Sequence, residues 1–243
     1  MKRFLALLCV SLFLPFAPVS APVQTLAEDN DFEIIDDEWD TTEEDEEKRK
    51  SMTESMDAAA GYDITYPEDG DFIYEPLGDD ESCQVLRYKG LEEEVILPEK
   101  LGELKVTRLY QTFSDCNSVE KVTLPETVES IDNMTFWKCT GLTSVLIPEG
   151  VTFLGRCSFG GCTALKEIEF PDTLETIDEM VFIGCVELKE IQFGKNLKSI
   201  GSQAFTACAG LEKVRIPRGA DVADDAFLQC PLLKEIEYYE PEG

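Results

Sequence analysis

The sequence predicts an α/β-type repeat solenoid, in which successive turns of one coil stack and share a common core. Two columns of equivalent residues predict this fold class. Cysteines recur at intervals of 23, 23, 23, 23 and 22 residues, at Cys116, Cys139, Cys162, Cys185, Cys208 and Cys230. Phenylalanines recur three positions before them, at Phe113, Phe136, Phe159, Phe182, Phe205 and Phe227. Because one unit of this length does not bury its own apolar face, the repeats are expected to stack against their neighbours.

Each repeat begins with a predicted β-strand. Apolar residues occur three, six and eight positions after each cysteine, as in Leu165, Ile168 and Phe170 after Cys162. This L-x-x-L-x-L spacing is that of the strand segment of a leucine-rich repeat, a class with a period of roughly 20 to 29 residues. Side chains alternate along a strand, so these strands are expected to form one parallel β-sheet on the concave face of a right-handed coil.

The end of each strand is marked by proline, which lacks the N–H group that a sheet ladder needs. The prolines are Pro125, Pro148, Pro171 and Pro217, and Gly194 takes this place in one repeat. The chain is then expected to return along a short irregular or helical limb. Two apolar columns lie on this limb, Val128, Val151, Leu174 and Leu197, then Ile131, Leu154, Ile177 and Ile200. Each coil is therefore expected to close around an apolar interior.

The cysteine column is predicted to consist of buried thiols that act as small hydrophobic side chains. Equivalent residues of adjacent coils lie about 4.7 to 4.9 Å apart, whereas a disulfide needs Cβ atoms about 3.5 to 4.5 Å apart. A metal ladder or redox chemistry is the alternative, but no C-x-x-C pair supports a zinc site. Cys83 and Cys157 lie outside the column. Alignment places Cys157 level with Met134, Met180 and Gln203 on the return limb, where partial exposure is expected.

The combination of C-x-x-L-x-x-I-x-L-P, then L-x-x-I, then A-F-x-x-C resembles the BspA-like family of bacterial surface-antigen leucine-rich repeats. The resemblance covers residues 91–238 and implies adhesion to, or recognition of, proteins or glycans of host or neighbouring cells. Residues 61–90 are expected to form a small N-terminal β cap, and residues 91–243 the solenoid. The last repeat is one residue shorter and has the features of a capping repeat, with Tyr238 and Tyr239 placed to cover the end of the core.

The N-terminal residues 1–27 are predicted to be a signal peptide. Lys2 and Arg3 precede an apolar run, Phe4 to Phe16, that is too short to span a bilayer, and cleavage is expected after Ala27. Residues 28–60 are predicted to be an acidic disordered spacer, because residues 28–47 contain 13 acidic residues and no basic one. The alternative is that this spacer binds calcium weakly, but the glycine turn of an EF-hand loop is missing. The chain is therefore expected to be secreted or extracellular, and a cell-surface location is the alternative.

Composition narrows the function further. The chain has 50 acidic and 21 basic residues, a net charge of −29, so nucleic acids and anionic membranes would be repelled. It has no histidine, which removes Ser-His-Asp and Cys-His catalysis and histidine-ligated zinc. We therefore predict a protein that is not an enzyme, with no catalytic residue, no cofactor and no metal site, and we expect a monomer that does not insert into membranes.

The candidate binding residues are those expected to point outward between the apolar positions of each strand. They are Glu120, Lys121, Thr143, Lys166, Glu167, Lys189, Glu190, Glu212, Lys213, Arg215, Lys234 and Glu235. The expected partner is a protein or a glycan.

Two other interpretations of these residues stay open. Opposite charges on neighbouring strands are expected to face each other, as in Glu190, Lys213 and Glu235, so the face is also consistent with a solvated charge ladder. The protein would then be a structural spacer or cap in a bacterial envelope assembly. An enzyme that uses a cysteine or a carboxylate pair is the third class, and no motif supports it.

Overall fold

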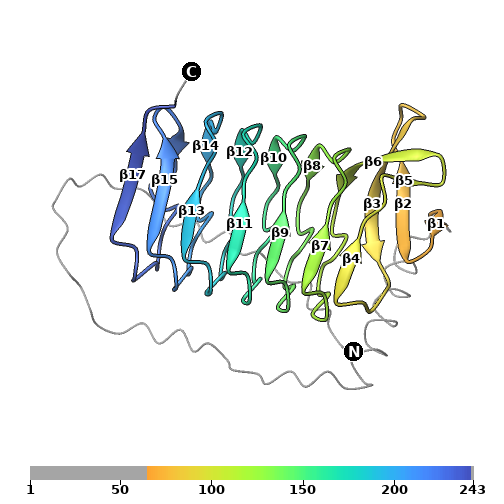
Figure 1. The fold of residues 1–243 in the computed structure, drawn as a ribbon, viewed down its shortest axis with the longest axis horizontal. Coiled ribbons are helices and arrows are strands. Elements are labelled where there is room, and N and C mark those ends of the chain that lie inside the picture. Colours follow the sequence, from red (N-terminus) through yellow and green to blue (C-terminus); the bar gives the residue numbers. More distant parts are fainter. Residues whose placement is uncertain (1–64, 242–243) are drawn as a thin grey trace, which may run out of the picture. The chain divides into compact units, whose positions relative to one another are not determined.

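The computed structural model describes residues 65–241, which fold into a stack of coils built from strands and turns (Figure 1). No helix occurs within these residues, so the expectation of helical return limbs is wrong. None of the described segments is a helix long and apolar enough to span a bilayer. The predicted signal peptide, residues 1–27, and the predicted acidic spacer, residues 28–60, lie outside the described residues.

Seven strands, one from each coil, line one face of the stack, which we call the strand face (Figure 1). They are β4 (Glu94–Ile96), β7 (Lys121–Thr123), β9 (Ser144–Leu146), β11 (Glu167–Glu169), β13 (Glu190–Gln192), β15 (Lys213–Pro217) and β17 (Glu235–Tyr239). Neighbouring strands are parallel and in register, so that Val95 lies beside Val122 and Val122 beside Val145. The strands form two sheets, β4-β7-β9-β11 and β13-β15-β17, so the expectation of a single sheet is wrong.

Two phenylalanines lie where the sheet is interrupted. Phe170 follows β11 and Phe193 follows β13, at a position that holds the smaller Leu124 and Ile147 in earlier coils. The two rings are 5.1 Å apart and tilted by 31°, and Phe170 also meets the ring of Phe182 edge-on at 5.8 Å. The interruption of the sheet therefore coincides with the place where aromatic rings replace aliphatic side chains at this position.

The return limbs form a second parallel ladder on another side of the coils. Its strands are β6 (Leu104–Leu109), β8 (Ser130–Ile131), β10 (Phe153–Leu154), β12 (Thr176–Ile177), β14 (Ser199–Ile200) and β16 (Asp221–Val222). At the N-terminal end of this ladder lie β1 (Glu68–Asp69), β2 (Phe72–Pro76) and β3 (Ser82–Tyr88), and β5 (Lys100–Leu101) pairs with β6. Strands β2 and β3 form an antiparallel hairpin, and β3 continues the ladder by pairing in parallel with β6.

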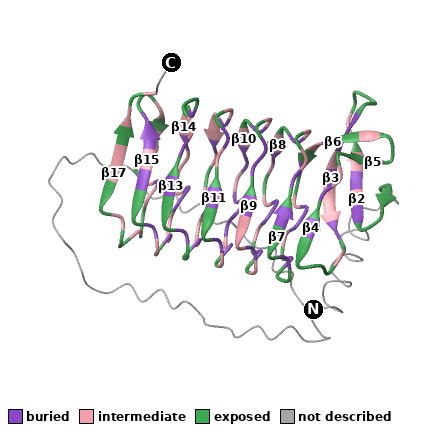
Figure 2. Cartoon of the chain, viewed as in Figure 1, coloured by how far each residue is buried: buried purple, intermediate pink, exposed green. Residues whose placement is uncertain are grey.

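The phenylalanine column forms the centre of the core. Rings of neighbouring coils are stacked, with Phe159 5.0 Å from Phe136 and 5.1 Å from Phe182. The five rings from Phe113 to Phe205 are fully buried. The apolar columns of the strands and of the return limbs point into the same interior, which Figure 2 shows in purple along the stack. The core predicted from the repeat is therefore confirmed.

The cysteine column lies beside these rings, as predicted. From Cys139 onward, each thiol of the column donates a hydrogen bond to the carbonyl of the phenylalanine in the preceding coil, such as Cys162 to Phe136 and Cys185 to Phe159, both at 3.1 Å. Cys83, Cys162, Cys185, Cys208 and Cys230 are free thiols. Burial raises the pKa of Cys185 to about 12, because an apolar interior disfavours the thiolate.

The expected partial exposure of Cys157 is wrong, because only 2% of this residue is accessible. Glycines at 155 and 160 flank it, and both are buried. A Cβ atom at Gly160 would collide with the ring of Trp137 in the preceding coil, so the two coils approach closely at this turn. The neighbouring coils therefore cover the thiol.

The two tyrosines of β17 have different surroundings. Tyr238 lies in register beside the fully buried Ile216 and is itself 45% exposed. Tyr239 turns toward the strand face, where its hydroxyl donates to the carbonyl of Phe193 at 2.8 Å and its ring lies 5.3 Å from the Arg215 guanidinium. Tyr238 therefore continues the inward column of the strands, whereas Tyr239 turns away from it.

A left-handed backbone recurs directly before each cysteine of the column. The position has φ of 59° at Asp115, 56° at Lys138 and 60° at Ala207, whereas glycine occupies it at Gly161 and Gly184. Residues other than glycine are strained in this left-handed region of the backbone. The sequence of each coil therefore tolerates a local conformational cost at this turn.

We expect Ala207→Gly to raise the free energy of unfolding by about 0.5 to 1 kcal/mol, and Gly184→Ala to lower it by a similar amount. The nearest atom to a Cβ built at Gly184 is 4.0 Å away, so the second substitution changes the conformational energy without a clash. Urea unfolding followed by circular dichroism measures both. Changes of the same sign would contradict the left-handed assignment.

Candidate binding face

The outward side chains of the strand face follow from the alternation along each strand. In β11, Glu167 and Glu169 are exposed and Ile168 between them is buried. Of the candidate residues, Lys121, Glu167, Glu190, Lys213, Arg215 and Glu235 lie within the strands. The other candidates, Glu120, Thr143, Lys166, Lys189, Glu212 and Lys234, lie at the entry to the strands. All twelve are exposed except Thr143 and Arg215, which are half-buried.

The first part of the strand face exposes two aliphatic side chains among its polar ones. Ile96 of β4 is 76% exposed and Leu146 of β9 is 60% exposed. Thr123 of β7 lies between them in register. Ile96 is absent from the candidate residues because the first repeat departs from the regular spacing. Leu146 lies at an outward position, as the alternation along its strand predicts.

The second part of the strand face is polar and centred on Arg215. Its guanidinium donates to Gln192 at 3.0 Å and to Glu237 at 3.0 Å, on the two neighbouring strands. Lys213 lies opposite Glu190 and Glu235, as predicted, but forms its ion pair with Glu237 at 3.7 Å. The charge ladder therefore forms in part, with a diagonal partner in place of the expected one.

A groove of about 500 Å³ lies where the strand sheet is interrupted. Its apolar lining is Ile168, Phe170 and Ile191, of which Phe170 is half-buried and the isoleucines are buried. Its polar lining is Glu169, Glu190, Gln192, Lys213 and Arg215. An apolar floor with charged groups of both signs around it is an arrangement that can hold a ligand.

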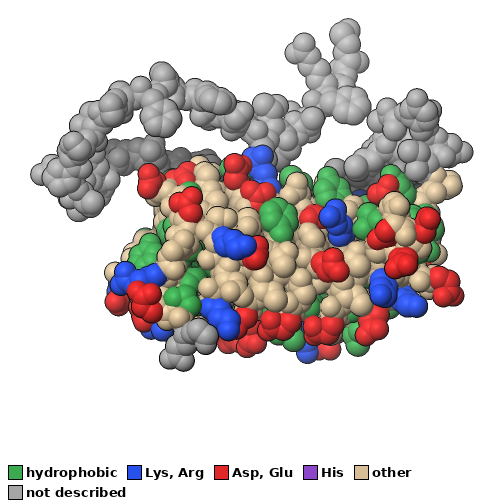
Figure 3. Space-filling view, turned by 90° about the horizontal axis from the view of Figure 1, so that it is seen from above, with side chains coloured by type: hydrophobic (Ala, Val, Ile, Leu, Met, Phe, Trp, Pro, Cys, Tyr) green, Lys and Arg blue, Asp and Glu red, His purple; other side chains and the backbone are tan. Residues whose placement is uncertain are grey.

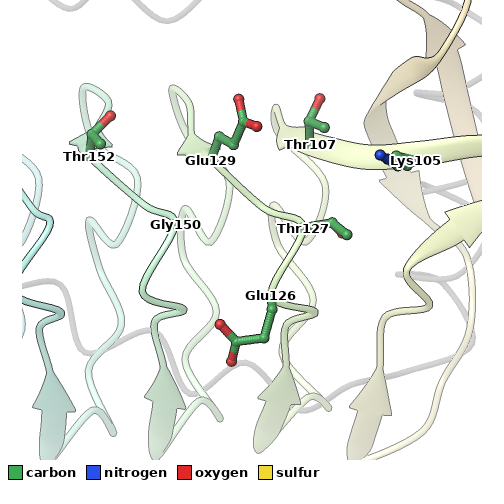
Figure 4. A pocket seen from close by; sticks show the side chains of 7 residues that line it. All are labelled: Lys105, Thr107, Glu126, Thr127, Glu129, Gly150 and Thr152. Carbon is green, nitrogen blue, oxygen red and sulfur yellow. The ribbon is translucent and has the colours of Figure 1, made fainter.

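A second cavity, of about 420 Å³, lies along the return limbs near β6, β8 and β10 (Figure 4). Its carboxylates, Glu126 and Glu129, point in different directions, so they do not form a pair for acid–base catalysis. The buried hydroxyl of Thr127 has no hydrogen-bond partner there. The equivalent Thr173 donates to the carbonyl of Val151 in the preceding coil at 3.0 Å, whereas the β5–β6 hairpin replaces that limb before Thr127.

Residues 65–241 contain no group of three or more Cys, Asp or Glu side chains arranged to hold a metal ion. Burial raises the pKa of Cys83 to about 11, which keeps this thiol protonated at neutral pH. Figure 3 shows Asp and Glu side chains gathered along one long edge of the solenoid with fewer Lys and Arg side chains among them. The acidic excess therefore extends to this surface and disfavours anionic partners.

Comparison with known proteins confirms the resemblance seen in the repeats. Residues 109–237 match the model of the BspA type leucine rich repeat region, in six copies. A leucine-rich repeat protein from T. pallidum has a similar structure, with 30% identity and a TM-score of 0.66, over 71% of this chain and 82% of that one. A leucine-rich repeat protein from Bacteroides ovatus has 26% identity and a TM-score of 0.59, over 72% of this chain and 53% of that one.

A leucine rich cell surface protein from Faecalibacterium prausnitzii shares the fold at 21% identity and a TM-score of 0.60, over 74% of this chain and 56% of that one. The chain thus spans about half the length of the last two proteins. No curated protein sequence matches the chain.

Proposed function

Because the chain belongs to the BspA-type leucine-rich-repeat family, we propose that it is a secreted or cell-surface protein that binds a partner protein or glycan through its strand face. Members of this type are typically cell-surface or secreted bacterial proteins, and leucine-rich-repeat families are generally not enzymes. The charged, apolar and small-residue order of residues 1–27 supports secretion. Adhesion to host or neighbouring cells is the form of recognition that we propose.

The exposed aliphatic side chains of the strand face are the observation that supports this proposal most. Ile96 and Leu146 stand on rigid, paired strands and remain mostly in contact with water. Burying one such side chain against a partner stabilises a complex by about 1.5 to 3 kcal/mol. A charge ladder that only solubilises the face would have no need of them.

The groove beside β11 supports the same face. It lies one strand beyond Leu146, because β9 pairs directly with β11. An aliphatic anchor and a groove with charged walls thus lie next to each other on rigid elements. Such a combination gives affinity through the apolar part and orientation through the polar part.

We expect the substitution Leu146→Glu to weaken partner binding by about tenfold or more, because it places a charge where the partner would bury an apolar group. The measurement is capture of the labelled chain on a glycan array and on a panel of host and bacterial surface proteins. Thr152→Glu, which adds the same charge at an exposed position on the return limbs, is the matched control and should bind normally.

Two outcomes would count against partner binding at the strand face. Equal binding by the Leu146 and Thr152 variants would place recognition elsewhere on the molecule. Capture of no protein or glycan by the unmodified chain would favour the alternative role, a structural spacer or cap in an envelope assembly.

A further inference from the structure

Two carboxylates of the groove beside β11 have no positive partner in the described part of the chain. Glu169 of β11 and Glu190 of β13 line the groove from the two sides of the sheet interruption. Both are exposed, and neither belongs to an ion pair formed within residues 65–241. The groove therefore offers negative charge that the solenoid itself leaves uncompensated.

The basic side chains of the groove are engaged elsewhere. Lys213 lies in register beside Glu190, but its ammonium group pairs with Glu237 of β17 at 3.7 Å. Arg215 pairs with the same Glu237 at 3.0 Å and donates to the neutral amide of Gln192 at 3.0 Å. Strand β15 lies between β13 and β17, so Glu237 attracts both cations toward the side of β15 that is farther from Glu190.

The floor of the groove is apolar. Ile168 and Ile191 are buried, and Phe170 is half-buried, so part of its ring remains accessible. An inorganic cation gains little from such a floor. A lysine or arginine side chain places its aliphatic stem along apolar surface and its charged head among carboxylates, and an aromatic ring attracts the same charge. The lining therefore fits the side chain of a basic amino acid.

An exposed leucine lies next to these carboxylates. Leu146 of β9 is 60% exposed and lies in register beside Glu169, on the neighbouring strand. Side chains two residues apart in an extended polypeptide point to the same side and lie about 6.6 Å apart. A segment that crosses the strands can thus place an aliphatic side chain on Leu146 and a basic one in the groove. A neutral glycan has no positive charge to offer there.

We propose that the groove between β11 and β13 is a pocket for a lysine or arginine side chain on an extended segment of a partner protein, with an aliphatic side chain of that segment on Leu146. This inference rests on the proposed function, because it names the chemistry of the partner at the same face. The whole chain has 50 acidic and 21 basic residues, so a basic partner is attracted at long range. Glu169 and Glu190 then select the position of its charge.

The test is fluorescence polarisation of labelled, amidated peptides titrated with the purified full chain. The first probe is Ser-Gly-Leu-Ser-Lys-Ser-Leu-Gly-Ser, in which a leucine lies two residues from the lysine on either side, so both chain directions are allowed. The second probe has glutamine in place of the lysine. The lysine probe should bind at least about tenfold more tightly than the glutamine probe, because only its side chain carries the charge that the carboxylates lack.

The variant Glu169→Gln/Glu190→Gln removes the two charges and keeps the shape of the side chains. It should raise the dissociation constant of the lysine probe by about tenfold or more and leave that of the glutamine probe unchanged. The matched control is Glu129→Gln/Glu149→Gln, at two exposed carboxylates of the return limbs. It removes the same net charge and should bind the lysine probe within about twofold of the unmodified chain.

The chain also has basic residues of its own, Lys48, Arg49 and Lys50, which lie outside the described residues. The variant Lys48→Ser/Arg49→Ser/Lys50→Ser of the full chain should bind the lysine probe nearly as the unmodified chain does. A gain of about tenfold would show that this basic segment of the chain competes for the groove, and would overturn the assignment to a partner.

The remaining outcomes separate this inference from the proposed function. Equal binding of the two probes, lost for both in Leu146→Ser, would keep the strand face as a binding surface and overturn the basic pocket. Equal weakening of the lysine probe by the two glutamine variants would show attraction by net charge alone and overturn the pocket as well. Absence of saturable binding of the lysine probe would also overturn it, whereas a captured protein or glycan that is lost in Leu146→Glu would still support the proposed function.

Discussion

Phe159→Ala is expected to lower the free energy of unfolding by about 3 to 5 kcal/mol. The ring is fully buried between those of Phe136 and Phe182, 5.0 and 5.1 Å away. Truncation removes the apolar surface of the benzyl group and leaves a cavity in a stack that relaxes only in part. Stability in a solenoid accumulates through contacts between neighbouring coils, so this one change weakens two interfaces.

The matched control is Phe227→Ala, at the end of the same column. Phe227 is half-buried and has one stacked neighbour, Phe205 at 5.2 Å, so its truncation weakens one interface and opens a smaller cavity. We expect about half the loss seen at Phe159 or less. Urea unfolding of both variants gives the comparison. A thermal melt that is unchanged by Phe159→Ala would contradict the assigned core.

Alkylation of the native chain should separate the cysteines by rate, with Cys230 much faster than Cys185. Burial raises the pKa of Cys185 to about 12 from its ordinary value of 9.0, which lowers its thiolate fraction about a thousandfold near neutral pH. The neighbouring Cys208 thiol stabilises the thiolate of Cys230 and so lowers the pKa of Cys230, which is also only half-buried. Mass spectrometry after timed treatment with iodoacetamide measures the two rates.

The denatured chain is the control for this experiment, because both thiols should then react at similar rates. Modification of Cys185 as fast as Cys230 in the native chain would show that the column is not buried. Rapid and selective modification of Cys83 or Cys157 would instead support the interpretation of the protein as a cysteine enzyme. Both residues are buried, so we expect neither to react quickly.

The repeat period was sufficient to predict most of the fold. Residues 23 positions apart recur in the same environment, and the register confirms this where Ile168 lies beside Val145 and Val214 beside Ile191. The alternation along each strand also predicted which side chains face solvent. The candidate residues therefore lie on or next to the strand face, as expected from local pattern alone.

The form of the return limbs was not predictable in the same way. Each limb contributes a strand of only two residues, such as Thr176–Ile177, and two residues are too few to show a strand period. The pairing partners of this strand are Phe153–Leu154 and Ser199–Ile200, one coil away on either side. The sequence therefore did not distinguish a helical limb from an extended limb, because the extended limb is defined by its pairing with neighbouring coils.

The groove in the strand face depends on packing across coils. The sequence shows phenylalanine at 170 and 193, but it does not show that these two rings meet each other and Phe182 beside the interruption of the sheet. The exposure of Ile96 likewise depends on the first coil, whose spacing differs from the others. Neither feature is visible in a single repeat.

The amino-acid pattern was thus enough to establish a stack of coils, the residues inside it and the direction of the strand side chains. The repeat period of 23 residues predicts the stack and its core, and the alternation of every second residue predicts which strand side chains point outward. Both can be read directly from the sequence. The division of the strand sheet, the second ladder and the covered Cys157 were decided by the three-dimensional fold. These features depend on contacts between coils, such as ring packing and the close approach of glycine backbones.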